Sequence, residues 1–239
     1  MLAIGNVSNA RQRLELILEQ DDVFKAFASD TQQLLLQQVS FRRFRFGQLI
    51  LSHQQTVADI YVLLNGSLQV GWLQNNGQLK VVNYTANYSA FNLVSFLQKK
   101  PVNYDFFAVE QVDIAVLSGQ IFLEQLQQQP QAMWQILQLL SQRMYSLFEQ
   151  SRYTHTANST QHIAYYLEQL ARQYGKESNN RCSIRLRMTQ QDFAELFGIS
   201  RQTLAKKLQP FLRQGILEWN YSQIHILDIQ QLRQLCKLE

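Results

Sequence analysis

The sequence predicts an α+β protein in which a jelly-roll β-barrel is followed by a long helix and then by a winged helix-turn-helix. Short apolar and aromatic segments broken by turn residues run from Phe41 to about Leu117, as expected of antiparallel strands. An apolar heptad repeat starts at Met133, and residues 189–208 form two short amphipathic helices around a glycine. The expected domains are a β-barrel with N-terminal helices at 1–129, a dimerisation helix at 130–157 and a winged helix-turn-helix at 158–239.

Length and composition fit two modest globular domains. The 239 residues are 46% hydrophobic, which is enough to build sizeable cores. No apolar run approaches the roughly 20 residues that span a bilayer. The N-terminus also lacks the apolar core of a secretory signal, so we expect a cytoplasmic protein with no membrane partner.

The two cysteines, Cys182 and Cys236, are isolated, so neither a disulfide framework nor a cysteine-rich metal site is indicated. Arg181 and Arg185 flank Cys182, and neighbouring cations lower the pKa of a thiol. A reactive thiol at Cys182 therefore remains an alternative to an inert one.

The barrel is predicted by turn residues and by alternation. Residues 10–38 precede it as helices, and Gly47 and Asn65–Gly66 separate strand-like segments. Phe44 and Phe46 alternate with arginines, which places both rings on an inner face. Roughly eight segments favour a jelly-roll or small barrel. We interpret the following aromatic set as barrel core, with a pocket for a small apolar or aromatic effector as the alternative: Tyr84, Tyr88, Phe91, Phe96, Tyr104, Phe106 and Phe107.

A long helix opens at Pro130 and carries a heptad seam. The seam residues, spaced alternately by four and three, are Met133, Leu137, Leu140, Met144, Leu147 and Ser151. This pattern predicts a parallel pair of helices that makes a homodimer; the alternative is a single helix that packs its stripe on its own barrel. A second helix, Thr160–Tyr174, is expected to lead into an exposed loop, Gly175–Asn180.

The helix-turn-helix is predicted by its capping residues. Thr189 caps the first helix with Asp192 three positions on, close to a capping box. Gly198 supplies a left-handed residue, and Ser200 caps the second helix. The inward positions of that second helix are Leu204, Leu208 and Phe211.

The opposite face of the second helix is basic and suits the major groove of double-stranded DNA. Arginine matches guanine, glutamine matches adenine, and lysine matches guanine or phosphate. The candidate DNA-binding residues are Arg201, Gln202, Lys206, Lys207, Ser200, Thr189 and Gln191. Residues 181–239 hold nine basic and five acidic side chains, which accounts for the whole net charge of +4. The alternatives are an ordinary helix pair with a solvated basic face, or a membrane-surface segment.

A hairpin signal follows the second helix. Gly215 precedes the apolar segment 216–219, a polar turn at Asn220–Ser222 and the segment 223–227, which together predict a wing. Trp219 and Tyr221 are interpreted as packing and turn residues. The last residues, 228–239, read as a short amphipathic helix that closes the domain.

This order of elements resembles the cyclic-AMP receptor/FNR (Crp/Fnr) family of bacterial transcription regulators, and the likeness covers nearly the whole chain. It is carried by DIYVLLNGSLQV at 59–70, HIAYYLEQLA at 162–171 and TQQDFAELFGISRQTLAKKL at 189–208. The resemblance implies an effector-type sensor barrel, a homodimer on DNA, and contact with RNA polymerase near Gly175–Cys182. The family's Arg, Glu and Arg correspond to Arg201, Gln202 and Lys206, so we expect a half-site unlike its familiar TGTGA.

The resemblance also locates an effector pocket with a degenerate sequence. The family's Gly-Glu-Leu falls on Phe91-Asn92-Leu93, and its phosphate-pairing Arg falls on Val102, followed by Asn103. Phe148, beside Leu147 of the seam, falls where the family's long helix meets adenine. A phosphate buried without a cation is costly, so we expect no response to cyclic AMP. A cyclic-nucleotide-responsive regulator of the same fold is the alternative.

Other sensors and an enzyme are weighed by their ligands. Residues 1–30 contain no Cys, which excludes the family's N-terminal iron–sulfur cluster. His53, in a barrel turn, is the one candidate for a haem ligand, and a haem-responsive regulator stays open. A cupin-like enzyme needs clustered His and Glu ligands, which the barrel segment lacks. We therefore expect no enzyme, no metal and no cofactor, with the effector unknown.

Overall fold

The computed structural model describes residues 7–74, 77, 79–85 and 88–238, which form two compact units. The first unit ends at Gln142 and the second begins at Arg143, inside one long helix. The extreme N-terminus, 1–6, where no secretory signal was expected, lies outside the described residues. Within the described part of the chain, no helix combines the length and apolar character that crossing a membrane requires.

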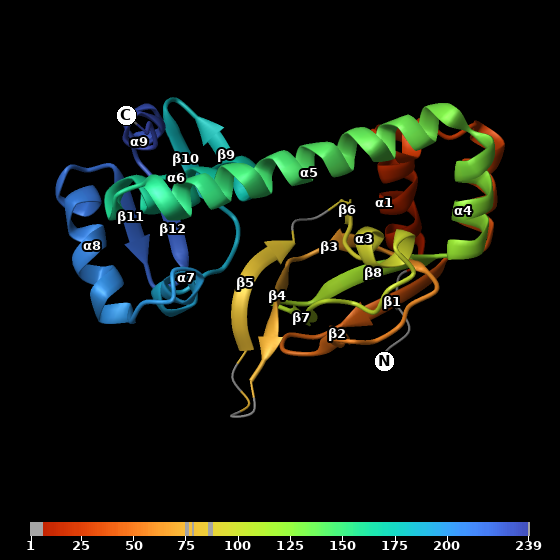
Figure 1. Cartoon of the computed structure of the whole chain (residues 1–239), viewed down its shortest axis with the longest axis horizontal. Coiled ribbons are helices and arrows are strands. Elements are labelled where there is room, and N and C mark those ends of the chain that lie inside the picture. Colours follow the sequence, from red (N-terminus) through yellow and green to blue (C-terminus); the bar gives the residue numbers. More distant parts are fainter. Residues whose placement is uncertain (1–6, 75–76, 78, 86–87, 239) are drawn as a thin grey trace. The chain divides into compact units, whose positions relative to one another are not determined.

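Eight strands among the described residues of the first unit form two four-stranded antiparallel sheets (Figure 1). One sheet has the order β1-β8-β3-β6 and the other β2-β7-β4-β5. The strands are β1 Ser40–Phe44, β2 Leu49–Leu51, β3 Ile60–Asn65, β4 Leu68–Leu73, β5 Leu79–Thr85, β6 Ser89–Ala90, β7 Asp105–Ala108 and β8 Val112–Leu117. The predicted β-domain is confirmed.

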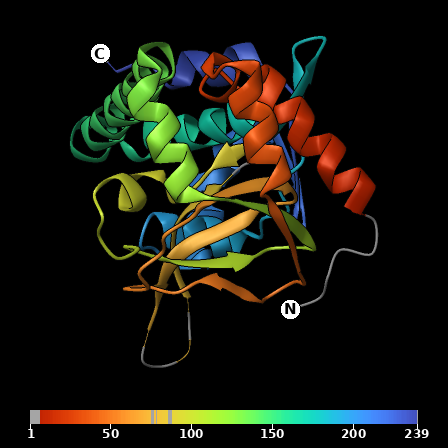
Figure 2. The same cartoon turned by 90° about the vertical axis from the view of Figure 1, so that its right-hand side faces the viewer.

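The sheets enclose one apolar core, and helices cover a second. Side chains alternate along β3 and β8, so Leu63 and Ile114 point between the two sheets while Val62 and Ala115 point to the other face. That other face packs under helices, and all four residues are fully buried. The helices of this unit are α1 Val7–Gln20, the 3-10 helix η1 Phe24–Ala26, α2 Ser29–Gln37, α3 Leu93–Leu97 and α4 Gly119–Gln128, and Figure 2 shows α1 and α4 on one side of the strands.

Two aromatic residues expected inside the barrel lie outside it, so those predictions are wrong. Strand β1 ends at Phe44, which is buried, whereas Phe46 lies in the following turn and is 77% exposed. Gly47 turns the chain with a φ of 76°, so the alternation stops before Phe46. Tyr88 has a φ of 65° and is 55% exposed, because it precedes β6 instead of belonging to a strand.

The second unit holds a small sheet with the order β11-β12-β10-β9 and the helices around it (Figure 1). The wing is the β11–β12 hairpin, in which Asn220 pairs with Gln223, and the closing helix is α9; both are confirmed. The helix that connects to the first unit is α5 Pro130–Thr156. The other elements are α6 Ser159–Tyr174, β9 Gly175–Ser178, β10 Arg181–Ile184, α7 Gln190–Leu196, α8 Arg201–Arg213, β11 Leu217–Asn220, β12 Gln223–Ile226 and α9 Ile229–Leu235.

The prediction of an exposed loop at Gly175–Asn180 is wrong. Most of this segment is strand β9, which pairs with β10. Asn179 and Asn180 form the turn with φ values of 49° and 62°. Two left-handed residues in a two-residue loop match a type I′ hairpin, for which asparagine is well suited. The polar sequence of β9 does not indicate a strand. The strand forms because this segment pairs with β10.

Candidate DNA-binding interface

The helix-turn-helix is held in place by local hydrogen bonds at both helix starts. The Thr189 hydroxyl accepts a hydrogen bond from the Asp192 amide at 3.1 Å, and the Asp192 carboxylate accepts one from the Thr189 amide at 2.8 Å. Ser200 caps α8 by accepting from the Thr203 amide at 3.1 Å. Gly198 has a φ of 62° between the two helices. The predicted capping box, turn and cap are confirmed.

Packing decides which face of α8 reaches solvent. Phe193 of α7 is fully buried, with its ring 5.0 Å from Phe197 and 5.3 Å from Trp219, measured between centroids. On α8 the buried side chains are Leu204, Leu208 and Phe211. The opposite face carries the predicted base-reading residues Arg201, Gln202 and Lys206, all exposed, while Lys207 is half-buried.

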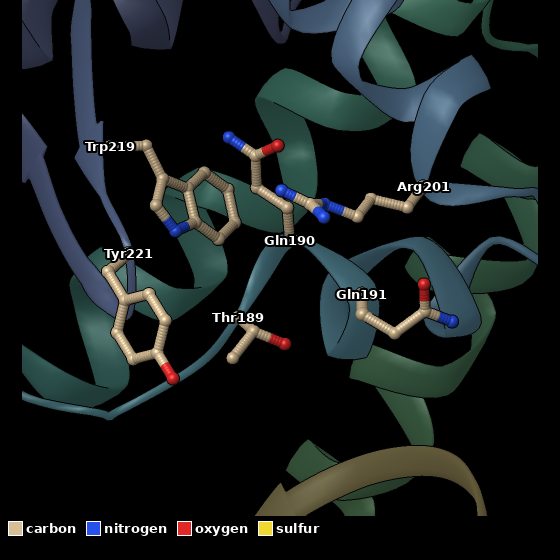
Figure 3. A pocket seen from close by; sticks show the side chains of 6 residues that line it. All are labelled: Thr189, Gln190, Gln191, Arg201, Trp219 and Tyr221. Carbon is tan, nitrogen blue, oxygen red and sulfur yellow. The ribbon is translucent and has the colours of Figure 1, made fainter.

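A cleft of about 500 Å³ lies between α7, α8 and the wing. It is lined by Thr189, Gln190, Gln191, Arg201, Trp219 and Tyr221 (Figure 3). The Arg201 side chain extends from α8 toward Gln190 and Trp219. The Gln191 side chain donates to the Glu195 carboxylate at 3.1 Å. The structure thus brings Thr189, Gln191 and Arg201 together.

Gln190 also lines this cleft, although it was not among the predicted DNA-binding residues. Its position as the first residue of α7, directly after the Thr189 cap, was the available signal. Trp219 is a packing residue and Tyr221 a turn residue, as predicted, but both also line the cleft.

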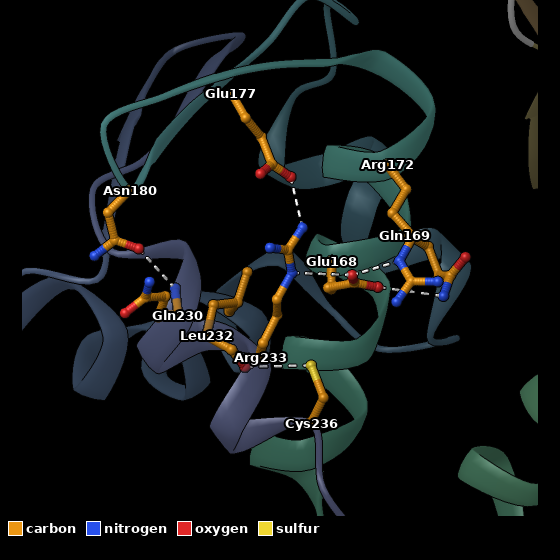
Figure 4. Close-up of polar contacts among 9 residues, drawn as sticks. All are labelled: Glu168, Gln169, Arg172, Glu177, Asn180, Gln230, Leu232, Arg233 and Cys236. Atoms are coloured by element: carbon orange, nitrogen blue, oxygen red, sulfur yellow. Dashed lines mark hydrogen bonds and ion pairs between the residues drawn. The ribbon is translucent and has the colours of Figure 1, made fainter.

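An ion-pair network fastens the sheet to α6 and α9 (Figure 4). Glu168 is buried, and its carboxylate lies 2.5 Å from Nε of Arg172 and 3.5 Å from Nε of Arg233. Arg233 also pairs with Glu177 of β9 at 2.6 Å. Removing a partner from a buried carboxylate is costly, so this network ties three elements into one block.

Both cysteines lie near this network and are free thiols. Cys182 is buried, and burial, with the charge of Glu177 as a second cause, raises the pKa of its thiol. Burial also raises the pKa of Cys236 to about 12. The reactive-thiol alternative at Cys182 is therefore wrong, because β10 turns the side chain into the core and away from the arginines that flank it in sequence.

Aromatic contacts connect the end of α5 to the helix-turn-helix. Tyr153 stacks on Tyr165 of α6 with 3.9 Å between ring centroids. Two further α6 side chains, His162 and Tyr166, contact Phe197 at 4.9 and 4.8 Å. Phe197 directly precedes Gly198, so α6 supports the turn between α7 and α8.

Two family models match the chain in the order of its units. The model of the cyclic nucleotide-binding domain matches residues 41–129, and that of the Crp-like helix-turn-helix domain matches residues 161–235. Together they run from β1 to α9. This chain belongs to the Crp/Fnr family. It is a DNA-binding transcription regulator of that family, which is not a family of enzymes.

Relatives and solved structures agree with this assignment. The regulator is 21% identical over 207 residues to a CRP-like cAMP-activated global transcriptional regulator of Mycobacterium tuberculosis, covering 87% of this chain and 90% of that protein. It is 20% identical to the transcriptional regulatory protein btr of Bordetella pertussis, covering 79% and 78%. The structure of FixK2 from Bradyrhizobium japonicum shares the fold with a TM-score of 0.71 at 14% identity, covering 84% and 98% of the two chains.

The seam residues of this Crp/Fnr regulator lie mostly on the surface of α5. Met133, Leu137, Met144 and Leu147 are each between 45% and 63% exposed, and Ser151 is also exposed. Leu140 differs, because it is half-buried and packs against the apolar core between the first unit's sheet and its helices. Ala132 and Ile136 are the α5 side chains buried in that core.

The predicted effector residues occupy different environments. Val102 is buried between the two sheets. In the same core, the ring centroids of Phe91 and Phe106 are 5.2 Å apart. The buried Asn92 side chain accepts from the Tyr61 amide at 2.9 Å and donates to the Asp59 carbonyl at 2.8 Å. Asn103 is exposed, and Phe148, on the second-unit half of α5, is exposed as well.

The haem and metal candidates can be placed too. The His53 side chain is exposed in a turn, and its backbone amide donates to the Asp105 carboxylate at 2.7 Å. Across the described ranges, no group of three or more His, Cys, Asp or Glu side chains could hold a metal ion.

We expect the stability of the second unit to fall as the pH drops below about 6.5, the ordinary pKa of histidine. Burial lowers the pKa of His162, so the unfolded chain takes up this proton more readily than the folded one. Stability is therefore unaffected above the unfolded pKa and is lost below it. Urea denaturation at pH 7.0 and 5.5 measures the change. His162→Phe should reduce the loss of stability between the two pH values. His155→Phe, at an exposed position, is the control and should lose as much stability as the wild type. An undiminished loss in His162→Phe would contradict the assignment of this pH dependence to His162.

Proposed function

We propose that this chain is a homodimeric, sequence-specific regulator that reads DNA with the exposed face of α8 and does not respond to cyclic AMP. One observation carries the proposal. A capped α8, anchored by Leu204 and Leu208, presents Arg201, Gln202 and Lys206 to solvent together. Side chains in the first turns of such a helix reach base edges in the major groove.

Each side chain of this face has a chemical role in the proposal. Arg201 pairs with O6 and N7 of guanine, and Gln202 pairs with N6 and N7 of adenine. Lys206 contacts guanine or phosphate. The backbone contacts come from Ser200, Thr189, Gln191 and Lys207. Since Gln202 both donates and accepts hydrogen bonds, the preferred half-site should differ from TGTGA.

The homodimer is supported by the apolar seam on α5. Four large seam side chains are about half exposed, which is unusual unless another surface covers them. A second copy of the seam provides that surface through knobs-into-holes packing. Two α8 helices then meet half-sites about one DNA turn, or roughly 34 Å, apart. RNA polymerase would contact the β9–β10 hairpin near Gly175–Cys182.

The lack of a cyclic-AMP response is supported by the barrel residues. Val102 stands in an apolar core where the family places an arginine, and Asn92 uses its side chain to bind the backbone of Tyr61 and Asp59. A cyclic phosphate there would lack a cation and would cost several kcal/mol to bury. The barrel then serves an effector other than cyclic AMP, or none.

Arg201→Ala should weaken binding by about 1–3 kcal/mol at one base position and relax specificity there, because the guanine contact is lost. Lys207→Ala should weaken all sequences alike and reduce the slope of log affinity against log salt by about one unit. Electrophoretic shift with duplexes selected from a random pool, and with scrambled duplexes, measures both. Equal binding of selected and scrambled DNA by the wild type would overturn the proposal, and exchanged effects of the two variants would reassign the groove face.

Leu147→Lys should convert the dimer to a monomer, because it buries a lysine in the seam at a site that is 63% exposed in one chain. Leu140 is unsuitable for this test, since its substitution would also disturb the first unit's core. Sedimentation equilibrium gives the mass. Gln138→Lys, an exposed position outside the seam, is the matched control and should stay dimeric; a dimeric Leu147→Lys would remove the seam as the interface.

Titration calorimetry of the full chain with cyclic AMP should show no binding heat. Val102→Arg restores a cation at the aligned position and is the natural companion variant, with circular dichroism to check its fold. Micromolar binding by the wild type would show that Val102 does not prevent cyclic-AMP binding and would favour the cyclic-nucleotide-responsive alternative.

A further inference from the structure

Tyr221, at the tip of the wing, occupies a position that normally takes glycine. Asn220, the last residue of β11, pairs with Gln223, the first residue of β12, so Tyr221 and Ser222 form a two-residue loop. Tyr221 has a φ of 55°, and it is the one residue of this loop with a positive φ. A left-handed first residue is the pattern of a type II′ turn, whose first central position favours Gly.

The tyrosine side chain gives the fold nothing that explains its presence there. It is 90% exposed, and within the described part of the chain no hydrogen bond or ring contact holds it. A bulky residue with a positive φ is strained, and a large aromatic ring in water adds no apolar burial. Strain at an exposed residue points to a contact with another molecule.

The surroundings of Tyr221 indicate which molecule. Tyr221 lines the cleft that Arg201 and Thr189 also line (Figure 3). Trp219 forms another wall of the cleft and is 8% exposed. This cleft therefore offers aromatic rings and hydrogen-bond donors without an acidic side chain. A sugar-phosphate strand, with apolar sugar faces and phosphate acceptors, matches such a lining.

We propose that Tyr221 is a DNA-contacting residue, whose ring packs on a deoxyribose and whose hydroxyl donates to a phosphate of the strand that borders the groove entered by α8. The assignment rests on the proposed function, since it requires α8 to be in the groove. A contact to sugar and phosphate carries no sequence information, so its contribution to affinity is the same on every sequence. Tyr221 is uncharged, so its contact displaces no counterion and leaves the salt slope unchanged.

Tyr221→Gly separates this role from folding. Glycine suits the left-handed backbone, so the midpoint of thermal unfolding should stay or rise, while affinity for a duplex selected by the wild type should fall about tenfold. Affinity for a scrambled duplex should fall by the same factor, with an unchanged salt slope. Tyr221→Phe, which removes only the hydroxyl, should show an intermediate loss. Tyr221→Asn, which also tolerates this conformation, repeats the test if the glycine variant unfolds earlier.

Tyr88→Gly is the matched control, because Tyr88 is another exposed tyrosine with a positive φ but lies in the first unit. It should leave DNA affinity at the wild-type value. Wild-type affinity in both Tyr221→Gly and Tyr221→Asn would overturn the inference, as would a loss confined to the selected duplex, which would indicate base reading. If the wild type selects no sequence at all, the proposed function fails first, so the two failures are distinguishable.

Discussion

The burial of Phe193 is the constraint on which the DNA-binding face depends. Its ring lies between Phe197, at the end of α7, and Trp219, on the wing, so one side chain fixes the helix pair and the hairpin together. With Leu204 and Leu208 also turned inward, the rotation of α8 about its axis is set. The exposed cationic and amide groups of α8 follow from that rotation, because side chains on opposite faces of a helix cannot both be buried.

The barrel shows how buried polar side chains can be committed to the fold itself. Its polar side chains serve the backbone: Asn92 bridges Tyr61 and Asp59, and Asp105 accepts from the amides of His53 and Leu73. The space between the sheets is filled by aliphatic and aromatic groups that include Val102 and Phe106. Burying a charge among such groups is costly unless the charge has a partner.

The sequence was most informative where structure is decided locally. Thr189 with Asp192, Gly198 and Ser200 each determine a helix end through neighbours within three residues, and these predictions held. It was least informative where distant segments decide. The polar strand β9 exists through its pairing with β10, and Phe46 follows a strand end that alternation alone does not mark. The cleft was not predicted for the same reason, because Gln190 and Tyr221 are brought to one cleft only by the folding of the wing against the helix pair.

Helix α9, near the C-terminus, helps to support the DNA-binding face, although none of its residues belongs to that face. Arg233 neutralises the buried Glu168, and the Cys236 carbonyl accepts the Tyr153 hydroxyl at 2.6 Å. A chain that stopped at Leu227 would leave that carboxylate with Arg172 as its remaining cation and that hydroxyl without its acceptor. Premature termination there would thus damage the support of the helix-turn-helix while sparing every residue expected to reach the bases, so loss of promoter control would arise from instability rather than from altered recognition.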